Sequence, residues 1–345
     1  MTWTRQRLNN LFFLLGVAAV VVMLFTFDVS FAELWHHLCH AGYWLIPIVG
    51  IWVLIYGINA AAWMAIIRGN AAPGEVPSFR RIYRLTITGY ALNYATPVGG
   101  LGGEPYRIME LSRHMSRQRA TSSVILYAMM HVFAHFWFWF TSVFLYLALV
   151  AVGDLPLNGV MAVALCVIVC FCLLAFYLFS RGYRNGLVLK VIRWVGKVPG
   201  LRGWSTRFIE AHRQALENVD RQIGDLHRQD KRAFYSALLL EYLSRIVQSM
   251  EVLFMLLLFG IDCGGGFAGI TLTALHSILI VALTTLLSNL IGFLPMQLGV
   301  QEGGFVISIA ALGLSAALGI FVSIICRVRE LIWIAIGVVL MKLKN

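Results

Sequence analysis

A glycine-rich stretch with the sequence NYATPVGGLGGEPYR, from Asn93 to Arg107, combines residue types that can bind an oxyanion. Prolines and glycines at this spacing are typical of a helix that breaks and restarts. A restarting helix directs unpaired backbone N–H groups and its positive dipole end toward the break. Glycines let those amides approach a ligand, and an arginine adds a cation that binds phosphate with two hydrogen bonds. The predicted contacts here are Asn93, Thr96, Pro97, Gly99, Gly100, Gly102, Gly103, Glu104 and Arg107.

One residue of this stretch, Glu104, does not suit a phosphate, because two negative charges repel each other. Its carboxylate can cap the second half-helix, form an i,i+3 ion pair with Arg107, or meet a cationic part of a ligand. Capping or pairing is the favoured interpretation. The neighbouring Pro105 suits the first turn of a helix, where the backbone needs no donor.

A related pattern occurs in the second half of the chain, where PMQLGVQE runs from Pro295 to Glu302 and is followed by two glycines. Both patterns read as Pro, six residues, Glu, with glycine nearby. Paired helix breaks in two halves of a membrane protein indicate a binding site at the interface of two repeats. Chance also produces such a pair, so repeat and coincidence both stay open. A true repeat would add Pro295, Gly299 and Glu302 to the predicted site.

Charged residues also lie inside long apolar runs later in the chain. They are Glu241, Arg245, Glu251, Arg327, Arg329 and Glu330. Because a charge is costly in hydrocarbon, these side chains are expected to face the bundle interior and to pair. Glu241 and Arg245 are spaced for an i,i+4 pair, although a surface pair near the cytoplasmic end is the alternative. Glu241, Arg245 and Arg327 join the predicted substrate-binding residues.

His131 and His135 have the i,i+4 spacing of two metal ligands on one helix face. No further ligand lies near them in the sequence, and the six cysteines follow neither a zinc nor a disulfide pattern. Nucleotide-binding loops and the nucleophile elbow of hydrolases are also missing from the sequence. We therefore predict no metal, no cofactor and no catalytic nucleophile.

The composition places these motifs in a membrane. Of the 345 residues, 60% are hydrophobic and 12% are charged, which is typical of a polytopic membrane protein. The net charge of +11 comes from Lys and Arg in blocks between apolar segments. Such blocks indicate cytoplasmic loops, so no nucleic-acid partner is expected.

Apolar runs of about 17 to 25 residues can cross a bilayer as helices. Candidates lie at 11–27, 43–67, 121–150, 156–180, 233–259 and 268–294, with a less regular region at 303–341 that Arg327, Arg329 and Glu330 are expected to interrupt. We predict an all-α polytopic membrane protein of about eight transmembrane helices, with seven as the alternative. Two re-entrant or broken helices related by a weak internal repeat complete this fold class.

Lys and Arg are missing between Arg7 and Arg68, between Arg119 and Arg181, and between Arg245 and Arg327. The loops inside these intervals are therefore expected outside, and both termini in the cytoplasm. Arginines flank the glycine-rich stretch on both sides, so it should enter from the cytoplasm and return there. Its apolar approach of twelve residues, Leu85 to Thr96, reaches only the midplane at about 1.5 Å per residue.

A basic connection at 181–232 belongs to the same single domain, which we take as 1–345. Its apolar residues Leu216, Val219, Ile223 and Leu226 have helical spacing. An amphipathic helix on the inner leaflet and a solvated linker helix fit this pattern equally. The first apolar run resembles a signal peptide but lacks a small-x-small cleavage site, so we expect it to be retained as a span.

The two motifs and the final charged helix together resemble the lysylphosphatidylglycerol synthase/flippase transmembrane-region family. The residues that carry this resemblance are Asn93, Thr96, Pro97, the glycine cluster, Glu104, Pro105, Arg107, Pro295, Gly299, Glu302 and Arg327. The family includes the flippase half of multiple peptide resistance factor and stand-alone proteins. The resemblance covers nearly the whole chain and implies a multi-pass protein of the bacterial cytoplasmic (inner) membrane. No aminoacyl-transfer domain follows, so we expect a stand-alone member without synthase activity.

This resemblance implies a lipid translocase of the flippase or scramblase type. The expected substrate carries a phosphate, as in an aminoacyl-phospholipid, a phospholipid or a polyprenyl-phosphate-linked lipid. Two alternatives stay open: an intramembrane enzyme with Glu104 or Glu302 as general base, and a scaffold for a lipid-synthesis enzyme. The expected partners are membrane lipids with a phosphate headgroup, while a lipid-synthesis enzyme and a second copy of the chain stay open.

Overall fold

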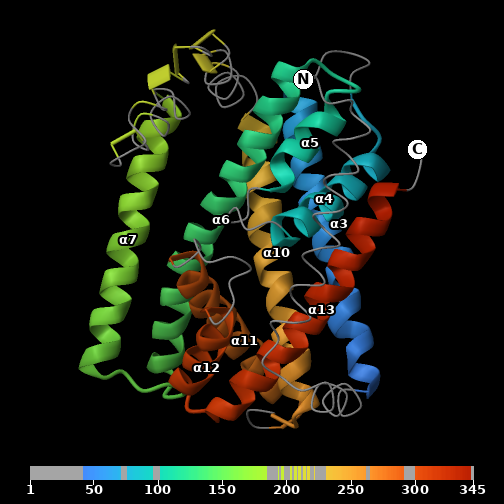
Figure 1. Cartoon of the computed structure of the whole chain (residues 1–345). Coiled ribbons are helices and arrows are strands. Elements are labelled where there is room, and N and C mark those ends of the chain that lie inside the picture. Colours follow the sequence, from blue (N-terminus) through green and yellow to red (C-terminus); the bar gives the residue numbers. More distant parts are fainter. Residues whose placement is uncertain are drawn as a thin grey trace.

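The computed structural model describes residues 42–70, 76–95, 102–184, 231–261, 265–290 and 300–342, with scattered residues between 193 and 221. These ranges contain helices and no strand. In chain order they are a short 3-10 helix η1 (Gly42–Trp44), α3 (Leu45–Asn70), α4 (Phe79–Ala95), α5 (Gly103–Leu111), α6 (Arg117–Ala151), α7 (Gly159–Arg184), α10 (Lys231–Leu258), α11 (Gly266–Leu290), α12 (Val300–Ala311) and α13 (Ala316–Lys342) (Figure 1).

The long helices confirm an all-α polytopic membrane fold. Four segments are long and apolar enough to cross a bilayer: Gly42–Gly69, Arg117–Ala151, Gly159–Ser180 and Gly266–Leu290. Helices α10 and α13 contain 28 and 27 residues and are also long enough, but they carry charged residues in their middle. The predicted span at 11–27 lies outside the described residues, and the total of eight stays a prediction.

The first broken helix has the predicted form. Helix α4 ends at Ala95 and the short helix α5 begins at Gly103, which places Glu104 and Pro105 in its first turn. Helix α5 folds back along α4, and its end at Leu111 packs in a cluster with Ile66, Phe234 and Met341. Helices α4 and α5 thus form a re-entrant hairpin. The end of α5 lies beside the ends of α3 and α13 and the start of α10.

The second broken helix is a hairpin of α11 and α12. Gly304 lies against Thr284, whose hydroxyl is 3.0 Å from that of Ser308. Beyond the end of α12, Leu312 packs against the cluster that contains Tyr146 and Leu155 at the opposite end of the bundle. In Figure 1 α5 accordingly lies in the upper part of the molecule and α12 in the lower part. The two hairpins therefore enter from opposite sides, a direction that the sequence left open.

The expectation that Arg327, Arg329 and Glu330 interrupt the last apolar region is wrong. Helix α13 runs through all three without a break, and the chain turns earlier, between Ala311 and Ala316. The three side chains are buried and form ion pairs inside the bundle. Because the pairs compensate their charges, the helix continues past them.

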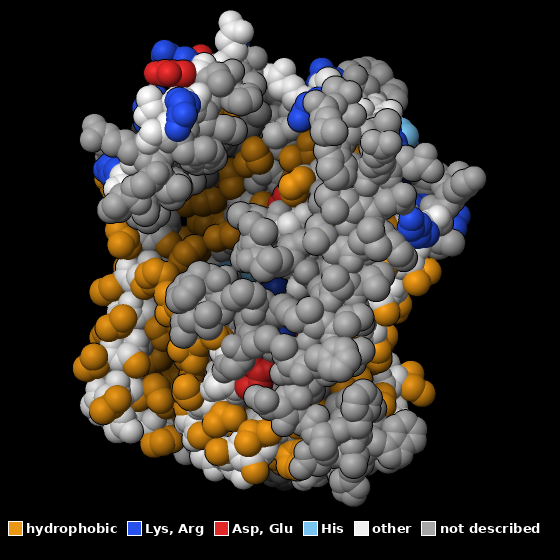
Figure 2. All heavy atoms as spheres, viewed as in Figure 1, with side chains coloured by type: hydrophobic (Ala, Val, Ile, Leu, Met, Phe, Trp, Pro, Cys, Tyr) orange, Lys and Arg blue, Asp and Glu red, His pale blue; other side chains and the backbone are white. Residues whose placement is uncertain are grey.

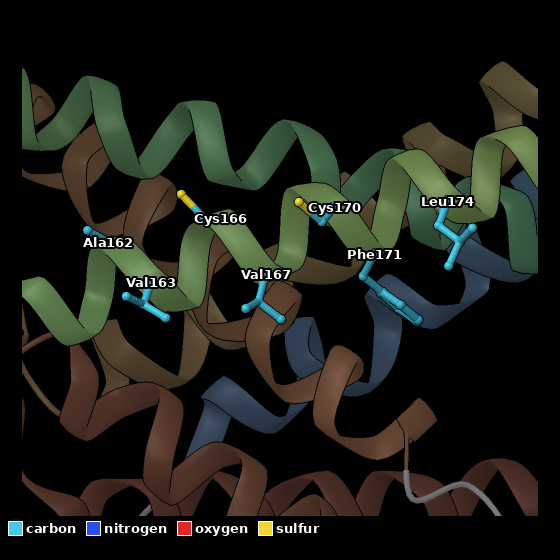
Figure 3. A pocket seen from close by; sticks show the side chains of 7 residues that line it. All are labelled: Ala162, Val163, Cys166, Val167, Cys170, Phe171 and Leu174. Atoms are coloured by element: carbon cyan, nitrogen blue, oxygen red, sulfur yellow. The ribbon is translucent and has the colours of Figure 1, made fainter.

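Helix α7 lies at the edge of the bundle and packs mainly against α6. Only 6% of its most apolar 18-residue window is buried, compared with 39–50% in the other three apolar spans. A shallow apolar depression on it is lined by Ala162, Val163, Cys166, Val167, Cys170, Phe171 and Leu174 (Figure 3). This surface suits contact with lipid chains.

The basic connection that follows α7 is described only in part. Leu216 is among the described residues, whereas Val219, Ile223 and Leu226 lie outside them. The amphipathic helix and the linker helix both stay predictions.

Candidate functional site

A polar cavity of about 530 Å³ lies between the two hairpins, α3, α6, α10 and α13. Charged side chains are visible near the middle of the face that Figure 2 shows, between apolar and undescribed surface. Of the residues predicted to bind substrate, four line this cavity: Asn93, Glu104, Arg107 and Arg245. The other charged or titratable residues that line it are Tyr90, Tyr94, Tyr127, His131, His135, Glu251, Cys326, Arg329 and Glu330.

Arg107 lies in an aromatic box and is only 2% exposed. Its guanidinium carbon is 5.6, 5.1 and 5.5 Å from the ring centres of Trp63, Tyr90 and Tyr127. The guanidinium donates to Glu104 Oε1 at 2.8 Å and to the Thr86 carbonyl at 3.3 Å. Stacking and pairing together fix the cation at the cavity wall. Among the interpretations of Glu104, the pair with Arg107 is confirmed.

The start of α5 is capped by Asn93 rather than by Glu104. The Gly103 amide donates to Asn93 Oδ1 at 2.6 Å, and Asn93 Nδ2 lies 3.4 Å from Glu104 Oε1. Two glycines allow this arrangement: a side chain at Gly103 would strike the Gly89 carbonyl, and one at Gly89 would strike Arg107. The Gly103 amide is thus already satisfied, and the glycine serves close packing of α5 on α4.

Arg245 lines the cavity in direct contact with His131. Its Nη2 atom lies 2.8 and 2.9 Å from the two ring nitrogens of His131, and Nη1 donates to Gln248 at 2.9 Å. The carboxylate of Glu241, which is fully buried behind the cavity, is 2.8 Å from His131 Nδ1 and 3.7 Å from Arg245. The alternative of a surface pair is therefore wrong, because tertiary packing of α10 against α3 and α6 encloses both residues.

A second ion pair on the wall joins α10 to α13. Arg329 donates to both carboxylate oxygens of Glu251, at 2.6 and 3.1 Å, and its guanidinium carbon is 4.0 Å from the Trp52 ring centre. Both partners are buried. The bidentate contact leaves this arginine less able to bind a ligand than Arg245.

Glu302 and Arg327, both in the predicted site, form an ion pair beside the cavity and do not line it. Arg327 donates to the two Glu302 oxygens at 2.8 and 3.2 Å and to Glu330 at 2.9 Å. Gln301 donates to Glu330 at 3.0 Å, and these two residues do line the cavity. The network attaches the first turn of α12 to the middle of α13, so the second hairpin is held by charge as the first is.

Six predicted contacts lie outside the described residues: Thr96, Pro97, Gly99, Gly100, Pro295 and Gly299. Gly102 is described and occupies the N-cap position of α5. The predicted role of these residues as ligands stays a prediction.

Several buried polar atoms of the wall have no hydrogen-bond partner within the described part of the chain. They include Asn59 Oδ1, Glu104 Oε2, Arg107 Nε, Arg245 Nε and Ser288 Oγ. Leaving a buried polar atom unpaired costs about 1–3 kcal/mol. A wall with several such atoms suits a cavity that takes in water or a polar ligand.

Sequence reasoning did not find His131, Tyr90 or Gln248 as parts of this site. One signal was present: Glu241, Ser244, Arg245, Gln248 and Glu251 form a polar stripe at helical spacing on α10. The i,i+4 spacing of His131 and His135 is that of two metal ligands. Among the described residues, no group of three His, Cys, Asp or Glu side chains is placed to hold a metal ion, and His135 Nδ1 bonds to the His131 carbonyl at 2.9 Å.

The fold and the cavity define a membrane-embedded helical protein with a charged site between two oppositely directed broken helices. The chain belongs to the family described as lysylphosphatidylglycerol synthase TM region, which residues 13–337 match. No curated protein and no solved structure shows significant similarity to this chain.

Proposed function

We propose that this protein is a lipid translocase that moves a phosphate-bearing polar lipid between the leaflets of the bacterial inner membrane. The observation that carries the proposal is the polar cavity between the two hairpins, with arginines in its wall. A charged headgroup loses its hydration when it enters hydrocarbon, at a cost of many kcal/mol. Polar groups fixed inside a bundle replace that hydration.

Arg245 is the best candidate for the cation that meets the phosphate. Arg107 and Arg329 each contact a carboxylate within 3 Å, whereas the carboxylate nearest to Arg245 is 3.7 Å away. Arg245 Nε also has no partner among the described residues, and the guanidinium lines the cavity. It can therefore turn toward an anion at a smaller loss than the other two.

The hairpins supply the geometry of transport in this proposal. Two broken helices that enter from opposite sides can open the cavity alternately to each side. The tails would stay in the bilayer along apolar surfaces such as that of α7 (Figure 3). Glu302 and Arg327 would hold the second hairpin, and Asn93 and Glu104 the first. The cytoplasmic side would be the upper end in Figure 2, where basic side chains gather.

The test measures leaflet access in proteoliposomes that contain fluorescent phosphatidylglycerol or a polyprenyl-phosphate analogue. Protein-dependent exchange is expected for wild type. Arg245→Gln should slow it about 10–100-fold, because a hydrogen-bonded ion contributes about 1.5–3 kcal/mol. The matched control, Arg213→Gln, removes an arginine whose side chain is 72% exposed, and should leave the rate unchanged.

The same vesicles separate the alternatives. A lipid recovered in chemically altered form would favour an intramembrane enzyme. Unaltered lipid without any exchange would favour a scaffold for a lipid-synthesis enzyme. Exchange that is equally fast in Arg245→Gln would overturn the assignment of the cavity as the route.

A further inference from the structure

His131 is a titratable residue of the cavity wall that contacts both Glu241 and Arg245. It lies on α6, and its side chain is 23% exposed, whereas Glu241 behind it is fully buried. Its Nδ1 atom is 2.8 Å from the Glu241 carboxylate, and Arg245 Nη2 lies 2.8 Å from Nδ1 and 2.9 Å from Nε2. The imidazole thus contacts both Glu241 and Arg245, which are themselves 3.7 Å apart.

The two contacts select one protonation state of the ring. A carboxylate accepts, so Nδ1 carries the hydrogen that it donates to Glu241. A guanidinium only donates, and Nε2 is then the one ring nitrogen that can accept from Arg245. In this arrangement the imidazole is neutral, with its hydrogen on Nδ1. A second proton would bind Nε2 and would point at the Arg245 cation. Repulsion between the two positive charges therefore disfavours protonation while Arg245 is in place.

Other charged and titratable groups surround this histidine. Helix α4 contributes Tyr90, and α5 contributes the Glu104–Arg107 pair. Helix α6 contributes Tyr127 and His135, and α10 contributes the Glu241–Arg245 pair. The Tyr90 hydroxyl is 3.2 Å from Nδ1, and the rings of Tyr90 and Tyr127 each lie close to both the histidine and Arg107. Among the described residues, no hydrogen bond joins Arg107 to the histidine. Arg245 is therefore the cation that directly contacts the ring.

We propose that the protein is proton-coupled and that His131 binds the transported proton. When an anionic headgroup draws Arg245 away, Nε2 loses its donor and accepts a proton from the solvent of the cavity, and the ring becomes an imidazolium paired with Glu241. When Arg245 returns, that proton leaves. The headgroup and the proton thus bind together and cross together. This inference rests on the proposed lipid transport.

Binding linkage tests the proton site without transport. Short-chain phosphatidylglycerol is added to the weakly buffered, purified protein, and proton uptake is followed with a pH indicator. Wild type should take up as much as one proton per protein, because linkage between two ligands is reciprocal. His131→Gln should take up none, since its amide replaces both contacts but does not titrate. Equal uptake by this variant would overturn the proposal.

Transport under a pH gradient tests the coupling. With the membrane potential held at zero, wild type should deplete fluorescent phosphatidylglycerol from the leaflet that faces the acidic side. With His131→Gln the fluorescent lipid should become evenly distributed between the two leaflets. This final distribution does not depend on how fast the variant moves lipid. The control, His276→Gln, changes a histidine 2.6 Å from Asp154 and outside the cavity, and should behave as wild type. An even distribution in wild type would overturn the coupling alone, whereas no lipid movement at all would overturn the proposed function with it.

Discussion

Replacing Glu251 with alanine should lower the free energy of unfolding by about 3–5 kcal/mol. The substitution leaves Arg329 buried with a longer contact, 3.7 Å to Glu330, as its nearest remaining carboxylate. The two bonds lost, at 2.6 and 3.1 Å, join α10 to α13, and both helices line the cavity. The measurement is the fraction of protein that stays monodisperse after heating in mild detergent, followed by size-exclusion chromatography.

Two variants control this result. Glu217→Ala breaks an exposed ion pair with Arg213, and should leave the melting temperature within error, because surface pairs contribute about 0–1 kcal/mol. The double variant Glu251→Leu with Arg329→Met removes both charges and should recover most of the lost stability. If Glu251→Ala had the melting temperature of wild type, the ion pair between Glu251 and Arg329 could not be buried and stabilising as described.

Removing Arg107 should abolish transport and also weaken the fold. Arg107→Ala empties the aromatic box and leaves Glu104 without its 2.8 Å partner at the start of α5. We expect about 3–5 kcal/mol of destabilisation and a loss of lipid exchange. Exchange in proteoliposomes is therefore compared at equal amounts of monodisperse protein.

A double variant separates the two effects. Arg107→Met with Glu104→Gln keeps much of the volume and leaves no unpaired charge, so the melting temperature should return toward wild type while transport stays impaired. Wild-type exchange by this variant would show that the pair at the break supports the hairpin only and contributes nothing to the headgroup site.

Much of the fold could be predicted, because a bilayer imposes a simple rule on the sequence. Long apolar runs must be helices, and α3, α6 and α7 follow from that rule alone. The first hairpin was also predictable, since Pro, Gly and a short apolar approach leave few other structures between two groups of arginines. Helix α5 begins at Gly103, as the position of Pro105 indicated.

The remaining features depend on tertiary contacts. Arg327 and Arg329 were expected to break a helix, but each meets a carboxylate from α10 or α12 that no local pattern could identify. His131 bonds to Glu241, which lies 110 residues away in the chain. The direction of the second hairpin follows from packing of Leu312 near Tyr146. Such pairings depend on how helices assemble.

Blocking the cavity tests most directly whether lipid headgroups pass through it. Ser288 lines the cavity and is 5% exposed, and its hydroxyl has no partner among the described residues. In Ser288→Cys, a membrane-impermeant methanethiosulfonate reagent would add a sulfonate inside the cavity. Wild type treated in the same way controls for its native thiols, which include the buried Cys326 in the cavity wall and the exposed Cys166 and Cys170 on α7.

We expect that labelling, measured by mass spectrometry, stops lipid exchange in Ser288→Cys and that a reducing agent restores it, while wild type keeps its rate throughout. Fully labelled Ser288→Cys protein that exchanges lipid at its untreated rate would contradict the cavity as the route. So would a thiol at this position that no reagent reaches from either side.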